Sequence, residues 1–242
     1  MAARRYDETK RQRAPGAGRP RKRPRTSDRP VIEEVVGAAS RLFARRGVAV
    51  TTMAEIADAS GLQVSSIYYY FRSKHEILER IVNDVNRVPL ELLEQARASH
   101  TDPATRLHAF VRADAAALCE FPFDINEIHR LAGDDDGTFT RYWADRQRLN
   151  DEVEQLVADG VADGSMVTID PKLAALTILA NDEAAQNWHR PVGARRLASR
   201  DPSAGGPYTP AEIGAFLADL ALRGLLTDPT ALPAIRAATD PT

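Results

Sequence analysis

The sequence contains little that could cross-link the chain or anchor it in a membrane. Its one cysteine, Cys119, excludes a disulfide within the chain, which fits a reducing compartment. No apolar run reaches the ~18 residues that a transmembrane helix needs. The N-terminus lacks the apolar segment of a signal peptide. We therefore expect a soluble, cytoplasmic protein.

The usual signatures of catalysis and metal binding are also missing. No glycine-rich phosphate loop follows a strand, no nucleophile elbow is present, and no His or Cys residues stand at metal-ligand spacing. The acidic run 134–136 lacks the twelve-residue spacing and the terminal glutamate of a calcium loop. An enzyme would have to rely on a lone cysteine and distant histidines, which is a weak basis. We expect no catalytic residues, no cofactor and no metal.

Helical signals dominate what remains. Alternating strand patterns are absent, and alanine and leucine outnumber β-branched residues. Capping boxes begin at Thr52 and Ser73, Asp-Pro pairs begin at Asp102 and Asp170, and Thr209 combines both signals. They predict helices from about residues 53, 74, 103, 171 and 210. Helical spacing predicts two more, over residues 29–46 and 138–159. The fold class is all-α.

Charge divides the chain into three parts. Residues 1–30 carry eleven Lys and Arg against three acidic residues, a net charge of +8. Residues 31–80 are balanced, and residues 81–242 carry −10. A basic arm, a neutral module and an acidic body indicate different roles, and the arm is the part that a polyanion would attract.

Residues 53–71 have the spacing of a helix-turn-helix. Ala57 provides the small residue that a close helix crossing needs, and Gly61 stands four residues later in the turn. Apolar residues at the right offsets hold the two helices together: Ile56, Leu62, Ile67 and Tyr70. The alternative is an αα-corner without a nucleic-acid role.

The second of these helices has an unusual outward face. At 3.6 residues per turn, Ile67, Tyr70 and Phe71 point inward. The outward residues are Val64, Ser65, Tyr68 and Tyr69, flanked by Gln63 and Ser66. Solvent exposure alone would favour Lys and Glu here. Serine hydroxyls, a valine methyl and tyrosines suit the bases and phosphates of a DNA groove.

With these residues in place, positions 29–80 resemble the DNA-binding domain of the tetracycline-repressor (TetR) family. The matching positions are Leu42-Phe43-Ala44, Gly47, Thr51-Thr52, Ile56-Ala57, Gly61, Ile67-Tyr68, Tyr70-Phe71 and Ser73-Lys74-x-Glu76. The resemblance implies that Thr51 or Thr52 contacts a DNA phosphate and that Lys74 holds another. It also implies that positions 63–66, 68 and 69 lie in the major groove. Gln63 and Ser65 depart from the common family residues, so no operator sequence is predicted.

The body resembles the family only in layout. By spacing alone, helices 171–188 and 210–225 could close this chain's own core or meet a second chain. The family layout favours a homodimer through these helices and an effector pocket formed by the middle helices. The pocket candidates are Phe121, Phe123, His129, Phe139, Trp143, Arg146 and Asn181. Pro89 should kink or break the helix that begins at Lys74.

The arm has two interpretations. Gly18-Arg19-Pro20 followed by Arg21, Lys22 and Arg23 resembles the core of an AT-hook, which inserts Arg into a narrow minor groove. The alternative is a disordered tail that raises nonspecific affinity by releasing counterions.

These observations predict four segments and one function. The segments are a basic arm (1–28), a three-helix DNA-binding domain (29–80), a larger helical effector-binding and dimerisation domain (81–226) and a tail (227–242). We expect a regulator that binds double-stranded DNA and is released from a palindromic operator by a small molecule. The alternative is a DNA-binding repressor or activator without an effector.

Overall fold

The computed structural model describes residues 29–83, 85–121, 125–133, 139–189, 191–192, 195–196 and 208–240. The basic arm, and with it Arg19, Arg21, Lys22 and Arg23, lies outside the described residues, as does Phe123. None of the helices in the described ranges is both long and apolar enough to span a bilayer.

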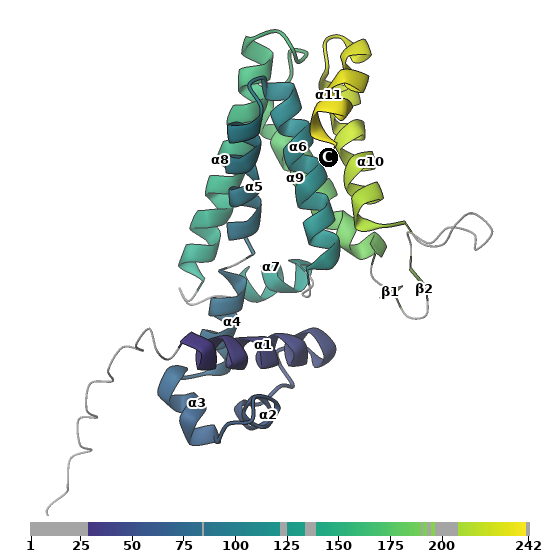
Figure 1. The fold of residues 1–242 in the computed structure, drawn as a ribbon. Helices are drawn as coiled ribbons and strands as arrows, with labels where there is room; N and C mark the ends of the chain where they lie inside the picture. Colours follow the sequence, from purple (N-terminus) through teal and green to yellow (C-terminus); the bar gives the residue numbers. More distant parts are fainter. Residues whose placement is uncertain are drawn as a thin grey trace, which may run out of the picture.

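The described part is almost entirely helical, as predicted (Figure 1). The helices are α1 (Arg29–Arg46), α2 (Met53–Ala59), α3 (Val64–Tyr70), α4 (Lys74–Val82), α5 (Arg87–Ser99), α6 (Pro103–Glu120), α7 (Ile125–Gly133), α8 (Thr140–Ala162), α9 (Pro171–His189), α10 (Pro210–Leu225) and α11 (Leu232–Thr239). A 3₁₀ turn, Pro229–Ala231, precedes α11. The two strands described, β1 (Pro191–Val192) and β2 (Arg195–Arg196), form a short antiparallel pair.

Local capping signals start the helices where the sequence predicts. The hydroxyl of Thr52 accepts a hydrogen bond from the Glu55 backbone N–H, and the Glu55 carboxylate accepts one from the Thr52 N–H. Thr209 forms the same reciprocal box with Glu212. At Ser73 only half of the predicted box forms, because the Glu76 carboxylate accepts from the Arg72 N–H instead.

Two glycines follow helix ends, and one proline lies in the first turn of a helix. Gly47 (φ 81°) follows α1, and Gly61 (φ 68°) makes the turn between α2 and α3; both conformations are strained for residues with a Cβ. The helix that begins at Lys74 is interrupted, but the interruption lies before Pro89 and not at Pro89, where it was predicted. Helix α4 ends at Val82, and Pro89 lies in the first turn of α5, where a missing N–H costs nothing.

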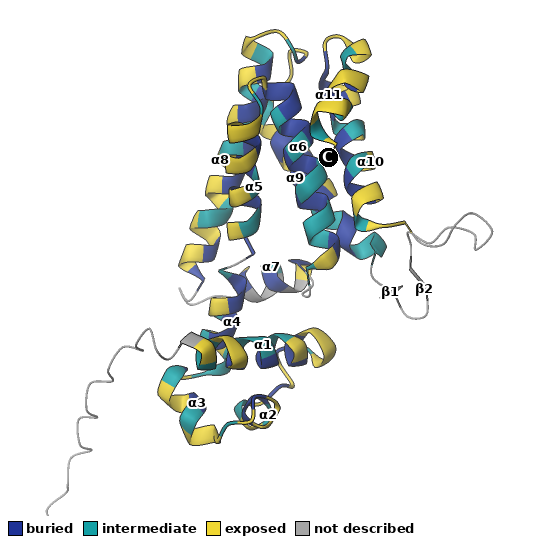
Figure 2. Ribbon diagram, in the orientation of Figure 1, coloured by how far each residue is buried: buried dark blue, intermediate teal, exposed yellow. Residues whose placement is uncertain are grey.

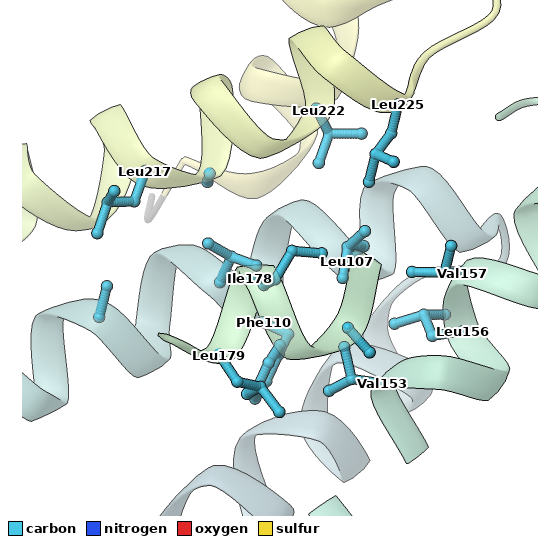
Figure 3. Packing of buried hydrophobic residues seen from close by; sticks show 14 of the residues in the cluster. Leu107, Phe110, Val153, Leu156, Val157, Ile178, Leu179, Leu217, Leu222 and Leu225 are labelled. Carbon is cyan, nitrogen blue, oxygen red and sulfur yellow. The ribbon is translucent and has the colours of Figure 1, made fainter. Parts of the chain in front are cut away.

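Helices α5, α6, α8, α9 and α10 stand side by side above the small module of α1–α4 (Figure 1). Their shared core is aliphatic with one central aromatic residue, Phe110 (Figure 3). Helix α10 approaches α6 so closely that a Cβ on Gly214 would lie 2.2 Å from the Arg112 carbonyl oxygen.

Helix α7 and the start of α8 belong to the core of the small module. Ile125, Ile128 and Ala132 of α7, with Tyr142 of α8, are buried in one cluster with Val85 and the apolar residues of α1–α4. In Figure 1, α7 lies across the top of this module, beneath the upright helices. The two predicted domains therefore share a core where they meet.

The C-terminal segment differs from the expected tail. Helix α11 buries Leu232 and Ile235 in the core of the body. The Arg112 guanidinium donates a hydrogen bond to the Thr239 carbonyl, 3.1 Å away. The segment looked tail-like because it is short and contains three prolines. The docking of α11 against α6 is a tertiary contact, which the residues of the segment do not predict by themselves.

Candidate DNA-binding face and ligand site

Helix α3 presents the face that the spacing predicts. Tyr68 (41% exposed), Tyr69 (49%) and Val64 (38%) are exposed, together with Gln63 and Ser65; Ser66 is half-buried. In Figure 2 the α3 ribbon has mostly exposed and intermediate positions. Ile67 is fully buried beneath them. The Tyr70 ring packs on the module core and meets the Tyr69 ring edge-on, with centroids 4.9 Å apart. This solvated face has no charged side chain within α3, an arrangement suited to reading base edges.

The two threonines before α2 have different surroundings. Thr51 is buried, and its hydroxyl donates to the Gly47 carbonyl at 2.8 Å. Thr52 is exposed and caps α2 through Glu55. Of the pair, Thr52 is therefore the one placed where a phosphate could approach.

The Lys74 ammonium lies in a cradle of backbone carbonyls. Its Nζ donates to the carbonyl oxygens of Val48 (2.9 Å), Ala49 (2.8 Å) and Thr51 (3.1 Å). An ammonium has three N–H donors, and these contacts use all of them. Lys74 thus ties the start of α4 to the loop before α2. A phosphate contact through Nζ, which stays a prediction, would have to displace one of these carbonyls.

Two of the predicted polar pocket residues meet at an unpredicted carboxylate, Glu183 of α9. Arg146 of α8 forms an ion pair with Glu183 at 2.5 Å, and the His129 Nε2 lies 3.9 Å from the same oxygen. Trp143 stacks on His129 with ring centroids 6.0 Å apart, and its Nε1 donates to the Ala132 carbonyl. Burial lowers the pKa of His129, an effect that Glu183 only partly offsets.

Two buried aspartates that were not predicted from the sequence adjoin this cluster. Burial raises the pKa of Asp114, in α6, to about 7, against the opposing effect of the Arg146 charge. Burial raises the pKa of Asp182, in α9, well above its usual value, and the negative charges of Asp114 and Glu183 add to this. Neither oxygen of Asp182 has a hydrogen-bond partner among the described residues. The available signal was an acidic residue inside an otherwise apolar helical stripe.

The remaining pocket candidates lie at different places in the structure. Phe121 is half-buried at the end of α6 and lines a cavity with Asp114, whereas Phe139 is buried in the core of the small module. Asn181 is exposed and lines a different hollow, of about 460 Å³, between α9 and α10. The structure therefore gathers His129, Trp143 and Arg146 but leaves Asn181 outside.

The hollow between α9 and α10 lies on an apolar exposed face. Leu173 and Leu220 line the hollow and are more than 40% exposed, and Leu176 and Phe216 of the same two helices are also more than 40% exposed. Exposed apolar residues in such a group mark an interaction surface. These are the two helices that were expected to contact a second copy of the chain.

Comparison with known proteins identifies both parts of the chain. The family model described as "Bacterial regulatory proteins, tetR family" matches residues 35–81, and one described as "Tetracyclin repressor-like, C-terminal domain" matches residues 100–199. Together they cover more than half of the chain.

Relatives match over most of their length. The chain is 28% identical to the HTH-type transcriptional repressor KstR2 of Rhodococcus jostii, over 66% of this chain and 80% of that protein. It is 25% identical to KstR2 of Mycolicibacterium smegmatis, over 80% of this chain and 89% of that protein. Among solved structures, PfmR from Thermus thermophilus, a TetR family transcriptional regulator, is 26% identical. Its TM-score is 0.65, with 78% of this chain and 97% of that one covered.

A crystal structure of AibR in complex with isovaleryl coenzyme A and operator DNA has the same fold. Its TM-score is 0.65 at 21% identity, with 78% of this chain and 97% of that one covered. The helix-turn-helix geometry, the helical body and both family matches agree. The chain belongs to the TetR family of bacterial regulatory proteins, and its N-terminal module is the DNA-binding part of a transcriptional regulator.

Proposed function

We propose that this protein is a dimeric transcriptional repressor that binds a palindromic operator through α3 and is released from it by a small molecule. The observation that carries the proposal is the uncharged, exposed face of α3, held on a well-packed helix-turn-helix. The proposal assigns base contacts to Val64, Ser65, Tyr68 and Tyr69. Gln63 and Ser66 lie at the edges of the same face.

Dimerisation follows from the exposed apolar face on α9 and α10. Burying this face against a second copy would remove Leu173, Leu176, Phe216 and Leu220 from water. Each large aliphatic or aromatic side chain contributes roughly 1.5–3 kcal/mol when fully buried. A twofold dimer presents two copies of α3, which is why the operator should be an inverted repeat.

Response to a ligand is supported by the contacts that join the body to the DNA-binding module. The Asn86 side chain, between α4 and α5, donates to the Tyr142 carbonyl of α8 at 2.9 Å. The Ile125 backbone N–H of α7 donates to the Gln186 side chain of α9 at 2.9 Å. A molecule that shifts α8 or α9 would thus move groups that share a core with α1–α4.

The proposal is tested by footprinting the full-length protein on the DNA around its own gene, with its mass in solution measured in parallel. A dimer that protects an inverted repeat, with half-site centres about one helical turn or a small multiple apart, supports the proposal. A monomer that protects an asymmetric site contradicts it.

The alternative, a regulator without an effector, makes a different prediction. Protein purified from its own host would then carry no small molecule when its mass is measured under native conditions. A bound metabolite that lowers operator affinity when added back supports the ligand-responsive repressor.

A further inference from the structure

A cavity of about 230 Å³ opens between the start of α5 and the end of α6, lined by apolar side chains and two carboxylates. Its apolar wall is formed by Val85, Val88, Pro89, Ala117, Leu118 and Phe121. Glu120 lines it at the exposed surface, and Asp114, only 3% exposed, lines it at the buried side. The cavity therefore leads from solvent to a buried carboxyl group.

Beyond Asp114 a small void continues toward the Arg146–Glu183 ion pair, which lines it together with Leu149 and Leu179. Asp182 adds a third buried carboxyl near the first two, although it lines the hollow between α9 and α10 and not this void. No described group donates a hydrogen bond to either of its oxygens. A native core normally satisfies such groups, so unpaired carboxyl oxygens close to Asp114 favour an occupant that donates hydrogen bonds.

The charge of this cluster selects the class of occupant. Three carboxyl groups face one guanidinium, and burial lowers the pKa of His129, so the cluster becomes negative once either Asp114 or Asp182 ionises. An anionic group reaching Asp114 would be repelled, whereas a cation would restore neutrality. Among the described residues, no three carboxylate, imidazole or thiol groups are arranged to hold a metal ion. An organic cation is therefore the class that best complements an ionised Asp114.

We propose that Asp114 binds the positively charged end of a small organic amine whose apolar part lies against Val88, Pro89, Leu118 and Phe121. This rests on the proposed ligand-responsive function and specifies its effector class. The volume is just below the usual range for ligand pockets, about 300–1,000 Å³, and suits a molecule with one ring or a short alkyl chain. Val85, in the wall, belongs to the core of the DNA-binding module, so an occupant touches both domains.

Binding should be coupled to release of a proton. The groups that act on Asp114 are Arg146 from α8 and Asp182 and Glu183 from α9; α5 contributes only apolar side chains to the cavity. Asp114 has a pKa of about 7, and its ionised form is the one that pairs with an ammonium group. Affinity for the amine should therefore rise roughly tenfold between pH 6 and pH 8.

The test uses the full-length protein and three sets of compounds, with benzyl, cyclohexylmethyl and butyl skeletons. Each set contains the primary amine, the alcohol and the corresponding carboxylate. Melting temperature and titration calorimetry report binding to the wild type, to Asp114→Asn and to Glu94→Gln. Glu94 is an exposed carboxylate of α5 outside the cavity, so its variant loses the same charge without touching the site.

The proposal expects at least one amine to bind the wild type and Glu94→Gln at least tenfold more tightly than its alcohol, with no binding of the carboxylate. In Asp114→Asn the amine and the alcohol should become equal. The proposal is overturned if the wild type binds amine and alcohol equally, prefers the carboxylate or binds no compound in any set. It is also overturned if the preference for the amine survives in Asp114→Asn.

Operator binding is measured on the same samples. A wild type that binds its inverted repeat but does not prefer amines refutes only the effector class, whereas failure to bind any inverted repeat refutes the repressor itself.

Discussion

The Lys74 ammonium donates a hydrogen bond to the Thr51 carbonyl oxygen, 3.1 Å away, and so ties α4 to the loop that precedes the helix-turn-helix. Two further carbonyls of that loop complete its cradle. The lysine that the family pattern assigns to a DNA phosphate thus has a structural role in the free protein.

Lys74→Ala should lower the free energy of unfolding by about 1–3 kcal/mol, because three carbonyl oxygens lose a charged donor. Urea unfolding measures this. Arg72→Ala, which removes an exposed cation two residues away, should change the stability by less than about 0.5 kcal/mol. If Lys74→Ala instead leaves stability unchanged and lowers the salt slope of DNA binding by about one, its role is a phosphate contact.

Tyr69→Ala and Ser65→Ala should each reduce the preference for operator over random DNA. A good base contact contributes roughly 1–3 kcal/mol of discrimination, so the operator affinity should fall about tenfold with little change in nonspecific binding. Fluorescence anisotropy on both DNAs at one salt concentration measures the ratio. Tyr208→Ala, an exposed tyrosine outside α3, is the matched control and should leave the ratio unchanged. If the affinity for both DNAs falls equally, Tyr69 and Ser65 do not contact base edges.

Phe216→Asp should convert the dimer to a monomer, because it replaces a large exposed apolar side chain of the α9–α10 face with a charge. Light scattering after gel filtration gives the mass, and the operator affinity should drop with it. Ala211→Asp is the control: it adds the same charge to an exposed position in the first turn of α10, where an acidic residue is tolerated. A dimeric Phe216→Asp protein would show that dimerisation uses another surface.

Gly214→Ala should destabilise the body by about 1–3 kcal/mol, since the added methyl group would lie 2.2 Å from the Arg112 carbonyl oxygen and would push α10 away from α6. Thermal unfolding tests this. Gly37→Ala makes the same change in mid-α1, where the nearest atom is the mobile end of Arg41 at 3.5 Å, and should be neutral or stabilising. Similar behaviour of the two variants would mean that α6 and α10 can separate without cost.

The buried carboxyl of Asp114 should make the protein less stable as the pH rises. Its pKa is about 7 in the folded chain and 3.8 without burial, so between these values the folded state keeps a proton that the unfolded state has lost. Stability therefore falls from about pH 4 to pH 7 through this group, and is flat above its folded pKa. Asp114→Asn removes this dependence and should be more stable than the wild type at pH 8. Urea unfolding at pH 5 and pH 8 measures the change, and an unaltered pH slope in the variant would show that Asp114 does not contribute.

Features that depend on residues within a few positions of one another are predictable from the sequence alone. The hydroxyls of Thr52 and Thr209 accept hydrogen bonds from the backbone N–H three residues later in the chain. Gly61 adopts the positive φ that the turn between α2 and α3 requires. The exposed and buried faces of α3 follow from its period and the apolar character of Ile67. These signals give the helix starts, the helix-turn-helix and its outward face, and they match the family.

The contacts between side chains that are far apart in the sequence become visible only in the tertiary structure. Lys74 reaches a loop 23 or more residues away, and Asp114, Arg146 and Glu183 converge from three helices around one void. Pairings of this kind depend on how whole helices cross, which periodicity within one helix does not encode. The same reason explains why α11 was expected to be a tail and why Asn181 separated from Arg146. The position of α11 is set by its docking on α6. The position of Asn181 is set by the side of α9 that faces the hollow between α9 and α10.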